Sequence, residues 1–376
     1  MAYALLSDPT LISILNPRTI PMKMPKLVSA IGQFRSVGIL TAVALATLAA
    51  TSAQATLVST PTGPYTTLDD AYTATIYAAD TNYTYTLGVA FVGNTLVRSA
   101  DNGTLYVYDN TTSTVHGNTV ANYTTHTVGG DGWNGRGITG DGQYVYGNGG
   151  GGLFKIDLST YTSTRLANSV GGQYGISFLN SHQLVYNAGS EVRLYDLTTQ
   201  TDTLFFNGVS FGDGLSVTPD GHVIIADLSG YLIRVLDSSG NQINTFSSTH
   251  DADGTAYGAG SIFKANTDGT LSKVDFSGPN FTGVGTETLL ATGLQYSDLS
   301  TVGPDGSFYI SALGAHYADG YSYGYADGSL IKVSLLGGGG FGPGSDNHGV
   351  PDSGITAVLL GSALLGLAAF RRRFLS

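Results

Sequence analysis

Cysteine is absent from the 376-residue chain, so disulfide bonds, thiol catalysis and cysteine-ligated metal sites are excluded. Glutamate is nearly absent too, since only Glu191 and Glu287 occur among the 27 acidic residues. Glutamate favours helices, whereas aspartate, asparagine and glycine favour turns, so this imbalance argues against a helical body. Tryptophan occurs once, at Trp133. The abundant residues, 53 glycines and 23 tyrosines, are typical of many short strands joined by tight turns.

Basic residues are scarce in the central part of the chain. Four of the 16 lysines and arginines precede residue 56 and three follow residue 370, while only Asp8 and Asp352 lie outside residues 56–349 among the acidic residues. Residues 56–349 therefore carry a net charge near −16. This charge argues against nucleic acid and anionic lipid as partners. The length of this part, about 294 residues, suffices for one large core.

The N-terminal region, residues 1–55, predicts a signal peptide. A conventional signal arises if translation begins at Met22 or Met24, and an uncleaved N-terminal helix is the alternative. We expect signal peptidase to cut after Ala55 and Thr56 to begin the mature protein. A basic region, an apolar region and a small-x-small cleavage site follow one another as Lys23–Arg35, Val37–Ala50 and Ala53-Gln54-Ala55.

The C-terminal residues 350–376 contain a short motif, an apolar run and a basic cluster. The 16-residue run Ile355–Phe370 would form a helix of roughly 24 Å, slightly short of the usual span of about 20 residues. Flanking arginines are retained in the cytoplasm, so we expect a transmembrane helix with the body outside the inner membrane. A flexible glycine-rich tether, residues 337–349, precedes the motif. The motif is Val350, Pro351, Asp352, Ser353 and Gly354, and the basic cluster is Arg371, Arg372 and Arg373.

This tail resembles the tripartite sorting signal of exosortase substrates, and it is closest to the VPDSG variant of the PEP-CTERM family of Gram-negative surface proteins. The resemblance covers only about the last 27 residues. It implies transient anchoring in the inner membrane, recognition by exosortase, removal of the tail, and delivery to the cell surface or extracellular matrix. A plain C-terminal anchor is the alternative. The tail does not indicate what the body does.

The body, residues 56–336, contains an internal repeat. Residues 214–247 read as four strands separated by turns. The third strand recurs six times, at intervals of 48, 39, 41, 38 and 59 residues. Four strands per unit and a period near 40 predict an all-β fold, a six-bladed β-propeller, although the pattern leaves the choice between six and seven blades open. The last unit lacks an outer strand, and we expect residues 71–79 to supply it and to close the ring.

The same repeat resembles those of NHL and gluconolactonase-type propellers, in its Pro219-Asp220-Gly221 turn and in Asp227 and Asp237. The resemblance supports the fold more than any activity. Sugar-lactonase propellers hold a central divalent metal in a cluster of carboxylates and amides. Neither Glu191, which opens a predicted strand, nor Glu287, in a segment that we interpret as loose, maps onto that cluster.

Two aromatic loops are candidates for ligand binding. Trp133 lies beside Arg136 in a glycine-rich loop, where an exposed indole could stack on a sugar ring of an extracellular polysaccharide. Tyr317, Tyr321 and Tyr323 form the second loop. The alternative is that Trp133 packs between blades. The glycines around it favour exposure, because they leave few side chains to bury an indole.

No cofactor is expected from the sequence, with one alternative. Asp251 and Asp253 resemble the start of a calcium loop, but the later ligands and the acidic twelfth position are absent. Turn-forming aspartates are therefore the preferred interpretation, and a Ca²⁺ ion is the alternative. The histidines never fall at metal-ligand spacing.

These observations predict an exported surface protein with a binding or structural role rather than an enzyme. The alternative is a propeller enzyme, a lactonase or lyase, with a metal or histidine in the central channel. The content of the channel distinguishes the two hypotheses. Acidic, asparagine or histidine side chains converging there would favour an enzyme, whereas glycine, serine and aliphatic groups alone would exclude one.

Overall fold

The structure is a computed structural model that describes residues 66–67, 71–79, 86–115, 118–168, 174–293, 296–316 and 322–335. These residues belong to a compact unit spanning residues 54–376. The expected signal peptide, tether and sorting tail lie outside the described residues, as do Tyr317 and Tyr321. Within the described part of the chain, no helix is long and apolar enough to cross a membrane.

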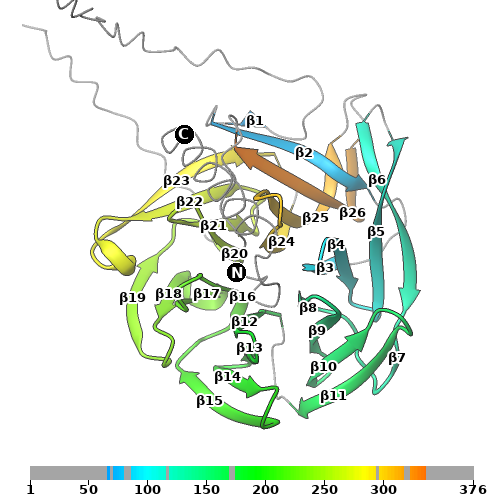
Figure 1. Cartoon of the computed structure of the whole chain (residues 1–376). Helices are drawn as coiled ribbons and strands as arrows, with labels where there is room; N and C mark the ends of the chain where they lie inside the picture. Colours follow the sequence, from blue (N-terminus) through cyan, green and yellow to red (C-terminus); the bar gives the residue numbers. More distant parts are fainter. Residues whose placement is uncertain are drawn as a thin grey trace, which may run out of the picture. The chain divides into compact units, whose positions relative to one another are not determined.

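Six sheets form a ring, as a six-bladed β-propeller requires (Figure 1). Each blade has four antiparallel strands that follow one another from the innermost to the outermost, except in blade 6. Blade 1 contains β3 (Thr86–Val92), β4 (Thr95–Ala100), β5 (Thr104–Val115) and β6 (Asn118–Thr127); blade 2 contains β8 (Gly137–Gly140), β9 (Tyr144–Gly149), β10 (Gly152–Asp157) and β11 (Thr162–Asn168); blade 3 contains β12 (Ile176–Asn180), β13 (Gln183–Ala188), β14 (Glu191–Asp196) and β15 (Thr201–Asn207). Blade 4 contains β16 (Gly212–Val217), β17 (Val223–Asp227), β18 (Leu232–Leu236) and β19 (Gln242–Ser247); blade 5 contains β20 (Ala252–Gly258), β21 (Ser261–Asn266), β22 (Leu271–Phe276) and β23 (Gly285–Thr292); blade 6 contains β24 (Tyr296–Val302), β25 (Phe308–His316), β26 (Ser322–Leu335) and β2 (Tyr72–Ala79).

Two short edge strands complete the sheets. β7 (Gly129–Gly130) pairs in parallel with β11 of blade 2, and β1 (Thr66–Thr67) pairs with β23 of blade 5. The helices of the described residues are two single 3₁₀ turns, Leu228–Gly230 and Pro279–Phe281. The predicted fold class is therefore confirmed. The four strands of blade 4 span residues 212–247, close to the four strands predicted for residues 214–247.

The N-terminal strand closes the ring, as the sequence predicts. β2 is the outermost strand of blade 6 and pairs antiparallel with β26, from Tyr72 opposite Leu335 to Ala79 opposite Ser329. Blade 6 thus takes strands from the beginning and from the end of the propeller, and β2 covers the edge that β26 would otherwise expose.

Burial follows the position of a strand in its blade. Every residue of β16 and β17 is buried, because neighbouring blades cover both faces of the inner strands, whereas the outermost strand β19 is half-buried to exposed along its length. The apolar side chains gather in six clusters, of which several fill the space between adjacent blades. One such cluster joins Val185 and Val192 of blade 3 to Leu215 and Val223 of blade 4.

Candidate metal centre in the central channel

The innermost strands present equivalent residues at one end of the channel. In five blades the residue at this position of the innermost strand is followed by a glycine. A β-carbon built on that glycine would lie only 1.3–2.4 Å from a main-chain oxygen of the next blade. The contacts run Gly88 to Arg136, Gly137 to Tyr174, Gly175 to Asp213, Gly214 to Asp253, and Gly254 to Asp298. This repeating contact defines six equivalent positions, which we call the channel ring: Leu87, Arg136, Tyr174, Asp213, Asp253 and Asp298.

Three consecutive blades, 4 to 6, therefore place an aspartate in the channel ring. Each aspartate lies where the register of its strand with the second strand is interrupted. Such β-bulges redirect a side chain and are frequent beside functional sites. The interruptions fall between Gly212 and Leu215, between Ala252 and Gly254, and between Ser297 and Ser300.

The three carboxylates converge. One oxygen atom each of Asp213, Asp253 and Asp298 lies within 4.8 Å of the other two, and the residues are only 5, 2 and 2 % exposed. Oδ1 of Asp213 and Oδ2 of Asp253 are buried without a hydrogen-bond partner. Oδ1 of Asp298 accepts a hydrogen bond from the Leu299 main-chain N–H, at 2.8 Å.

Burial and mutual repulsion oppose ionisation of this cluster. Burial is the main cause that raises the pKa of all three carboxyl groups, and the charge of a neighbouring aspartate raises each further. The largest charge effects come from Asp298 on Asp213, from Asp213 on Asp253, and from Asp253 on Asp298. Three buried acids, two of them with an unpaired oxygen, therefore need either protons or a cation.

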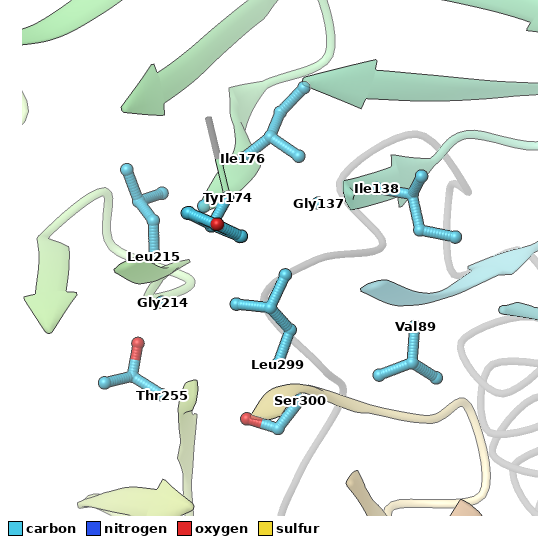
Figure 2. A pocket seen from close by; sticks show the side chains of 11 residues that line it. Val89, Gly137, Ile138, Tyr174, Ile176, Gly214, Leu215, Thr255, Leu299 and Ser300 are labelled. Carbon is cyan, nitrogen blue, oxygen red and sulfur yellow. The ribbon is translucent and has the colours of Figure 1, made fainter. Parts of the chain in front are cut away.

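A small cavity lies among the innermost strands; it is lined by residues that follow the aspartates in the sequence, such as Leu215 and Leu299, and not by the aspartates themselves (Figure 2). Its volume is about 10 Å³, enough for a single water molecule or ion. Most of its wall is glycine and aliphatic, but Thr255 and Ser300 add hydroxyl groups in the blades that carry Asp253 and Asp298. Oγ of Ser300 is also buried without a partner. The other side chains that line it belong to Val89, Ile138, Tyr174, Ile176, Leu215 and Leu299.

These residues fit a divalent cation that prefers oxygen ligands. Calcium binds carboxylate oxygens at about 2.3–2.6 Å, so two oxygens on one ion are at most about 5 Å apart. The separations among the three aspartates satisfy this limit without any rearrangement. Carboxylate and hydroxyl donors favour Ca²⁺, Mg²⁺ or Mn²⁺ over softer metals.

The opposite side of the channel ring is cationic and aromatic. The Arg136 guanidinium lies over the Tyr174 ring, with Cζ 4.8 Å from its centroid. The charge of Arg136 lowers the pKa of Asp213, although burial and Asp298 have larger effects in the opposite direction. A second arginine, Arg98, is fully buried, and its charge counteracts the rise in the pKa of Asp298.

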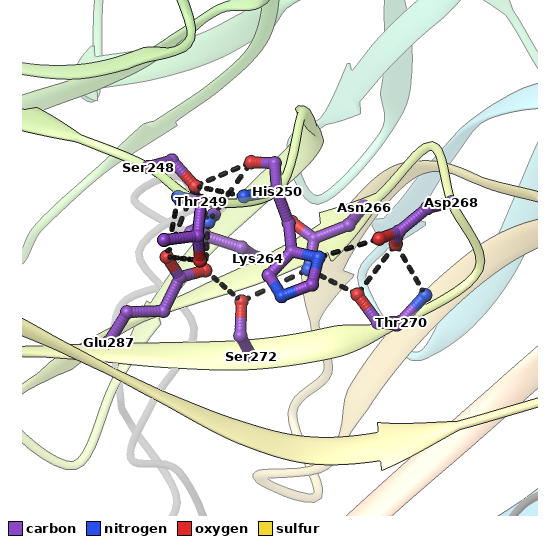
Figure 3. A network of polar contacts seen from close by, with 9 residues as sticks. All are labelled: Ser248, Thr249, His250, Lys264, Asn266, Asp268, Thr270, Ser272 and Glu287. Atoms are coloured by element: carbon purple, nitrogen blue, oxygen red, sulfur yellow. Dashed lines mark hydrogen bonds and ion pairs between the residues drawn. The ribbon is translucent and has the colours of Figure 1, made fainter. Parts of the chain in front are cut away.

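A polar network fixes the loop that leads into β20 (Figure 3). Lys264 is fully buried and forms an ion pair with Glu287 while donating to Ser248 Oγ. Glu287 also accepts hydrogen bonds from Thr249 Oγ1, at 2.9 Å, and from Ser272 Oγ, at 2.7 Å. Hydrogen bonds from these groups, above all from Lys264, outweigh burial and lower the pKa of Glu287 to about 2. The interpretation of Glu287 as part of a loose segment is therefore wrong.

The expectation of an exposed Trp133 is also wrong. Its side chain is 4 % exposed and packs between blades 1 and 2, against Ile138 and Phe154 among others. Three of the surrounding glycines, Gly130, Gly135 and Gly137, let the main chain pack closely against other main-chain groups instead of opening the loop to solvent. Gly135, for example, leaves no room for a β-carbon beside the Ala100 carbonyl.

The other candidate residues have mixed outcomes. Arg136 is half-buried in the channel ring, and Tyr323 lies on β26. Asp253 joins the acidic cluster, but Asp251 does not. Sequence reasoning missed Asp213 and Asp298. The signal that could have found them is their common place at the start of the innermost strand, seen in Asp213-Gly214-Leu215-Ser216 and Asp253-Gly254-Thr255-Ala256.

Comparisons with known proteins identify the tail and the fold. Residues 349–374 match the VPDSG-CTERM motif, which confirms the resemblance of the tail. No curated protein matches the chain.

Among solved structures, a candidate oxidoreductase (glucose dehydrogenase) from Thermus thermophilus is 11 % identical, with a TM-score of 0.53, covering 70 % of this chain and 99 % of that one. Regucalcin, a calcium-binding protein from Agrobacterium tumefaciens, is 14 % identical, with a TM-score of 0.50, and the match covers 72 % of this chain and 95 % of that one. A luciferin-regenerating enzyme is 13 % identical, with a TM-score of 0.51, and the match covers 73 % of this chain and 99 % of that one. At these identities the likeness shows the fold alone.

Proposed function

We propose that the channel binds a divalent cation, with Ca²⁺ as the best fit, through Asp213, Asp253 and Asp298. The observation that carries the proposal is the convergence of three buried carboxylates, of which two keep an oxygen atom without a partner. Buried charges persist in proteins when they are paired or bind metal. A protein of similar fold, regucalcin, is described as calcium-binding, which supports a Ca²⁺ ion as the ligand.

Thermal unfolding with and without Ca²⁺ tests the proposal. After treatment with EDTA, added Ca²⁺ at 100 times its Kd should stabilise the protein by about 2.7 kcal/mol, and the melting temperature should rise accordingly. Asp253→Asn should abolish this rise, whereas Asp251→Asn, two residues away and outside the cluster, should keep it. An unresponsive wild-type protein, or equal responses of the two variants, would contradict the proposal.

The sorting motif supports an exported protein of the cell surface or extracellular matrix. We infer that signal peptidase and an exosortase remove the two ends and that the propeller remains as the mature protein. Intact mass should place the mature N-terminus near Thr56 and show that residues 355–376 are absent. Surface-extracted protein that still carries Arg371–Arg373 would contradict this inference, as would identical products with and without an exosortase.

A second candidate function is hydrolysis of a small ester or lactone at the cation site. The converging acids are the feature that favours the enzyme alternative, and a luciferin-regenerating enzyme shares the fold. A bound divalent cation would polarise a carbonyl oxygen and lower the pKa of a bound water. Hydrolysis of an aldonolactone that requires Ca²⁺ and fails in Asp253→Asn, but not in Asp251→Asn, would establish this activity. Binding of Ca²⁺ without turnover would leave the protein a cation-dependent binding protein.

A further inference from the structure

We propose that Tyr231, together with Asp251, His250 and Asp268, binds a neutral polysaccharide on the surface of blades 4 and 5. These residues are not part of the channel ring. They belong to the turn between β17 and β18, the loop between β19 and β20, and the turn between β21 and β22. Binding there needs no cation, and a protein delivered to the cell surface would meet such a polymer.

Tyr231 is an exposed aromatic side chain. Its exposed fraction is 55 %, whereas the other large apolar side chains that are exposed in the described part of the chain are aliphatic: Leu204, Ile243 and Val284. An aromatic ring that is exposed to this extent can cover the apolar C–H face of a sugar ring, while its hydroxyl group keeps a polar partner.

The main chain of Tyr231 is strained. Its φ is 52°, in the left-handed region that bulky residues rarely adopt. The preceding turn is anchored by the buried carboxylate of Asp227, which accepts from the Phe211 main-chain N–H at 2.9 Å and pairs with Arg234 at 2.8 Å. The Tyr231 carbonyl accepts from the Ser248 N–H at 2.9 Å. Strain of this kind persists only where the surroundings enforce it, and it is concentrated at functional sites.

Polar groups that suit sugar hydroxyls lie on the adjoining loop. Burial raises the pKa of Asp251, and a hydrogen bond from the Tyr231 hydroxyl counteracts this rise, so the two side chains are neighbours. On the same loop, Nδ1 of His250 pairs with Oδ2 of Asp268 at 2.6 Å, and these two side chains are 29 and 46 % exposed (Figure 3). The imidazole and the carboxylates are groups that bind hydroxyls in pairs.

The loop that carries these groups is held in place before any ligand arrives. The ion pair of Lys264 and Glu287 fixes Ser248 and Thr249, which directly precede His250. A site whose groups are already in position loses little conformational freedom on binding.

The charge of the site favours a neutral polymer. Burial raises the pKa of Asp268, but hydrogen bonds from Thr270 and His250 outweigh burial, so the pKa lies below its ordinary value and the carboxylate is ionised at neutral pH. Residues 56–349 as a whole are also negatively charged. An anionic polysaccharide would be repelled, whereas the hydroxyl groups of a neutral one donate to carboxylates.

Affinity electrophoresis in native gels tests the proposal. The probe is the extracellular polysaccharide of the producing cells, separated by anion exchange into a neutral and an acidic fraction. We expect the neutral fraction to retard the wild type equally in Ca²⁺ and in EDTA, and Tyr231→Gly to weaken this binding at least tenfold. Glycine adopts a positive φ without strain, so this variant should keep the melting temperature of the wild type. Tyr231→Phe, which retains the ring, should bind nearly as well as the wild type.

Tyr161→Gly is the matched control. Tyr161 also has a positive φ, 51°, but its ring is stacked on His126 in another part of the molecule, with the centroids 3.6 Å apart. This variant should bind the neutral fraction as the wild type does.

Four results would overturn the proposal: no retardation by the neutral fraction, retardation by the acidic fraction alone, equal binding of Tyr231→Gly and Tyr161→Gly, or loss of binding in EDTA. The last result would place the ligand at the cation. Binding that depends on Tyr231 in a wild type that does not respond to Ca²⁺ would support this site while the proposed cation site fails.

Discussion

Gly214 faces the main-chain oxygen of Asp253 so closely that a β-carbon on Gly214 would lie 2.3 Å from it. The residue after one aspartate thus sets how near the next blade, with its own aspartate, can approach. Since main-chain atoms meet here on both sides, neither can move aside as a flexible side chain would. The convergence of the carboxylates depends on this absence of a side chain.

Gly214→Ala should therefore destabilise the protein by about 1–3 kcal/mol, because the extra methyl group forces two innermost strands apart. Urea unfolding measures the loss. Gly142→Ala is the control, since a β-carbon there would have no heavy atom within 4 Å. Equal stabilities of the two variants would show that the channel tolerates the displacement.

Removal of one acid from the channel should stabilise the cation-free protein. In Asp298→Asn the side-chain oxygen can still accept from the Leu299 N–H, while the repulsion on Asp213 disappears. In EDTA at pH 8 we expect a gain of at least about 1 kcal/mol, since one unit of pKa corresponds to 1.36 kcal/mol. In the presence of Ca²⁺ the wild type should instead be more stable than Asp298→Asn. A variant less stable than the wild type in EDTA would argue against repulsion among the acids.

Trp133→Ala should lower the free energy of unfolding by about 3–5 kcal/mol, as expected for a buried aromatic side chain between two blades. Trp133→Phe should cost much less, because Nε1 of the indole has no hydrogen-bond partner to lose. Chemical denaturation of both variants, with the 74 % exposed Val284→Ala as a control, checks this prediction. A loss below 1 kcal/mol in Trp133→Ala would contradict the core position.

The contrast between Trp133 and the aspartates shows what the sequence could predict. The propeller fold, its strand positions and closure by residues 71–79 follow from turn residues and a period near 40, which are local patterns, whereas the choice of six blades over seven does not follow from them. Burial of Trp133 and convergence of Asp213 with Asp298 depend on contacts between blades, where residues of different repeats meet. A glycine can expose a loop to solvent or allow close packing. Which of the two occurs depends on contacts with the neighbouring blade, which the local sequence does not show.

The stability of the protein should fall at acidic pH partly through Glu287. Because its pKa is lowered from 4.5 to about 2 in the folded protein, its contribution is fully present above pH 4.5 and is lost as the pH falls through about 2. The expected contribution is on the order of 3 kcal/mol. Urea unfolding between pH 6 and 2 should show a shallower decline for Glu287→Gln than for the wild type.

The matched control for this measurement is Glu191→Gln. Glu191 is the other glutamate of the chain, and its side chain is 39 % exposed at the start of β14. Its replacement should leave the pH profile close to that of the wild type. Indistinguishable profiles for the Glu287 and Glu191 variants would show that the ion pair with Lys264 does not set the acid limit of the fold.

Blade 6 determines when the protein can finish folding during synthesis. The strand that contains Tyr72 has no partner until Leu335, 263 residues later in the chain, has been synthesised. A chain interrupted anywhere before residue 322 therefore lacks the segment that β2 pairs with. Pairing over such a distance is slow, because the closure entropy must be overcome before the contacts form. Completion of the ring therefore requires that the chain has been made as far as residue 335.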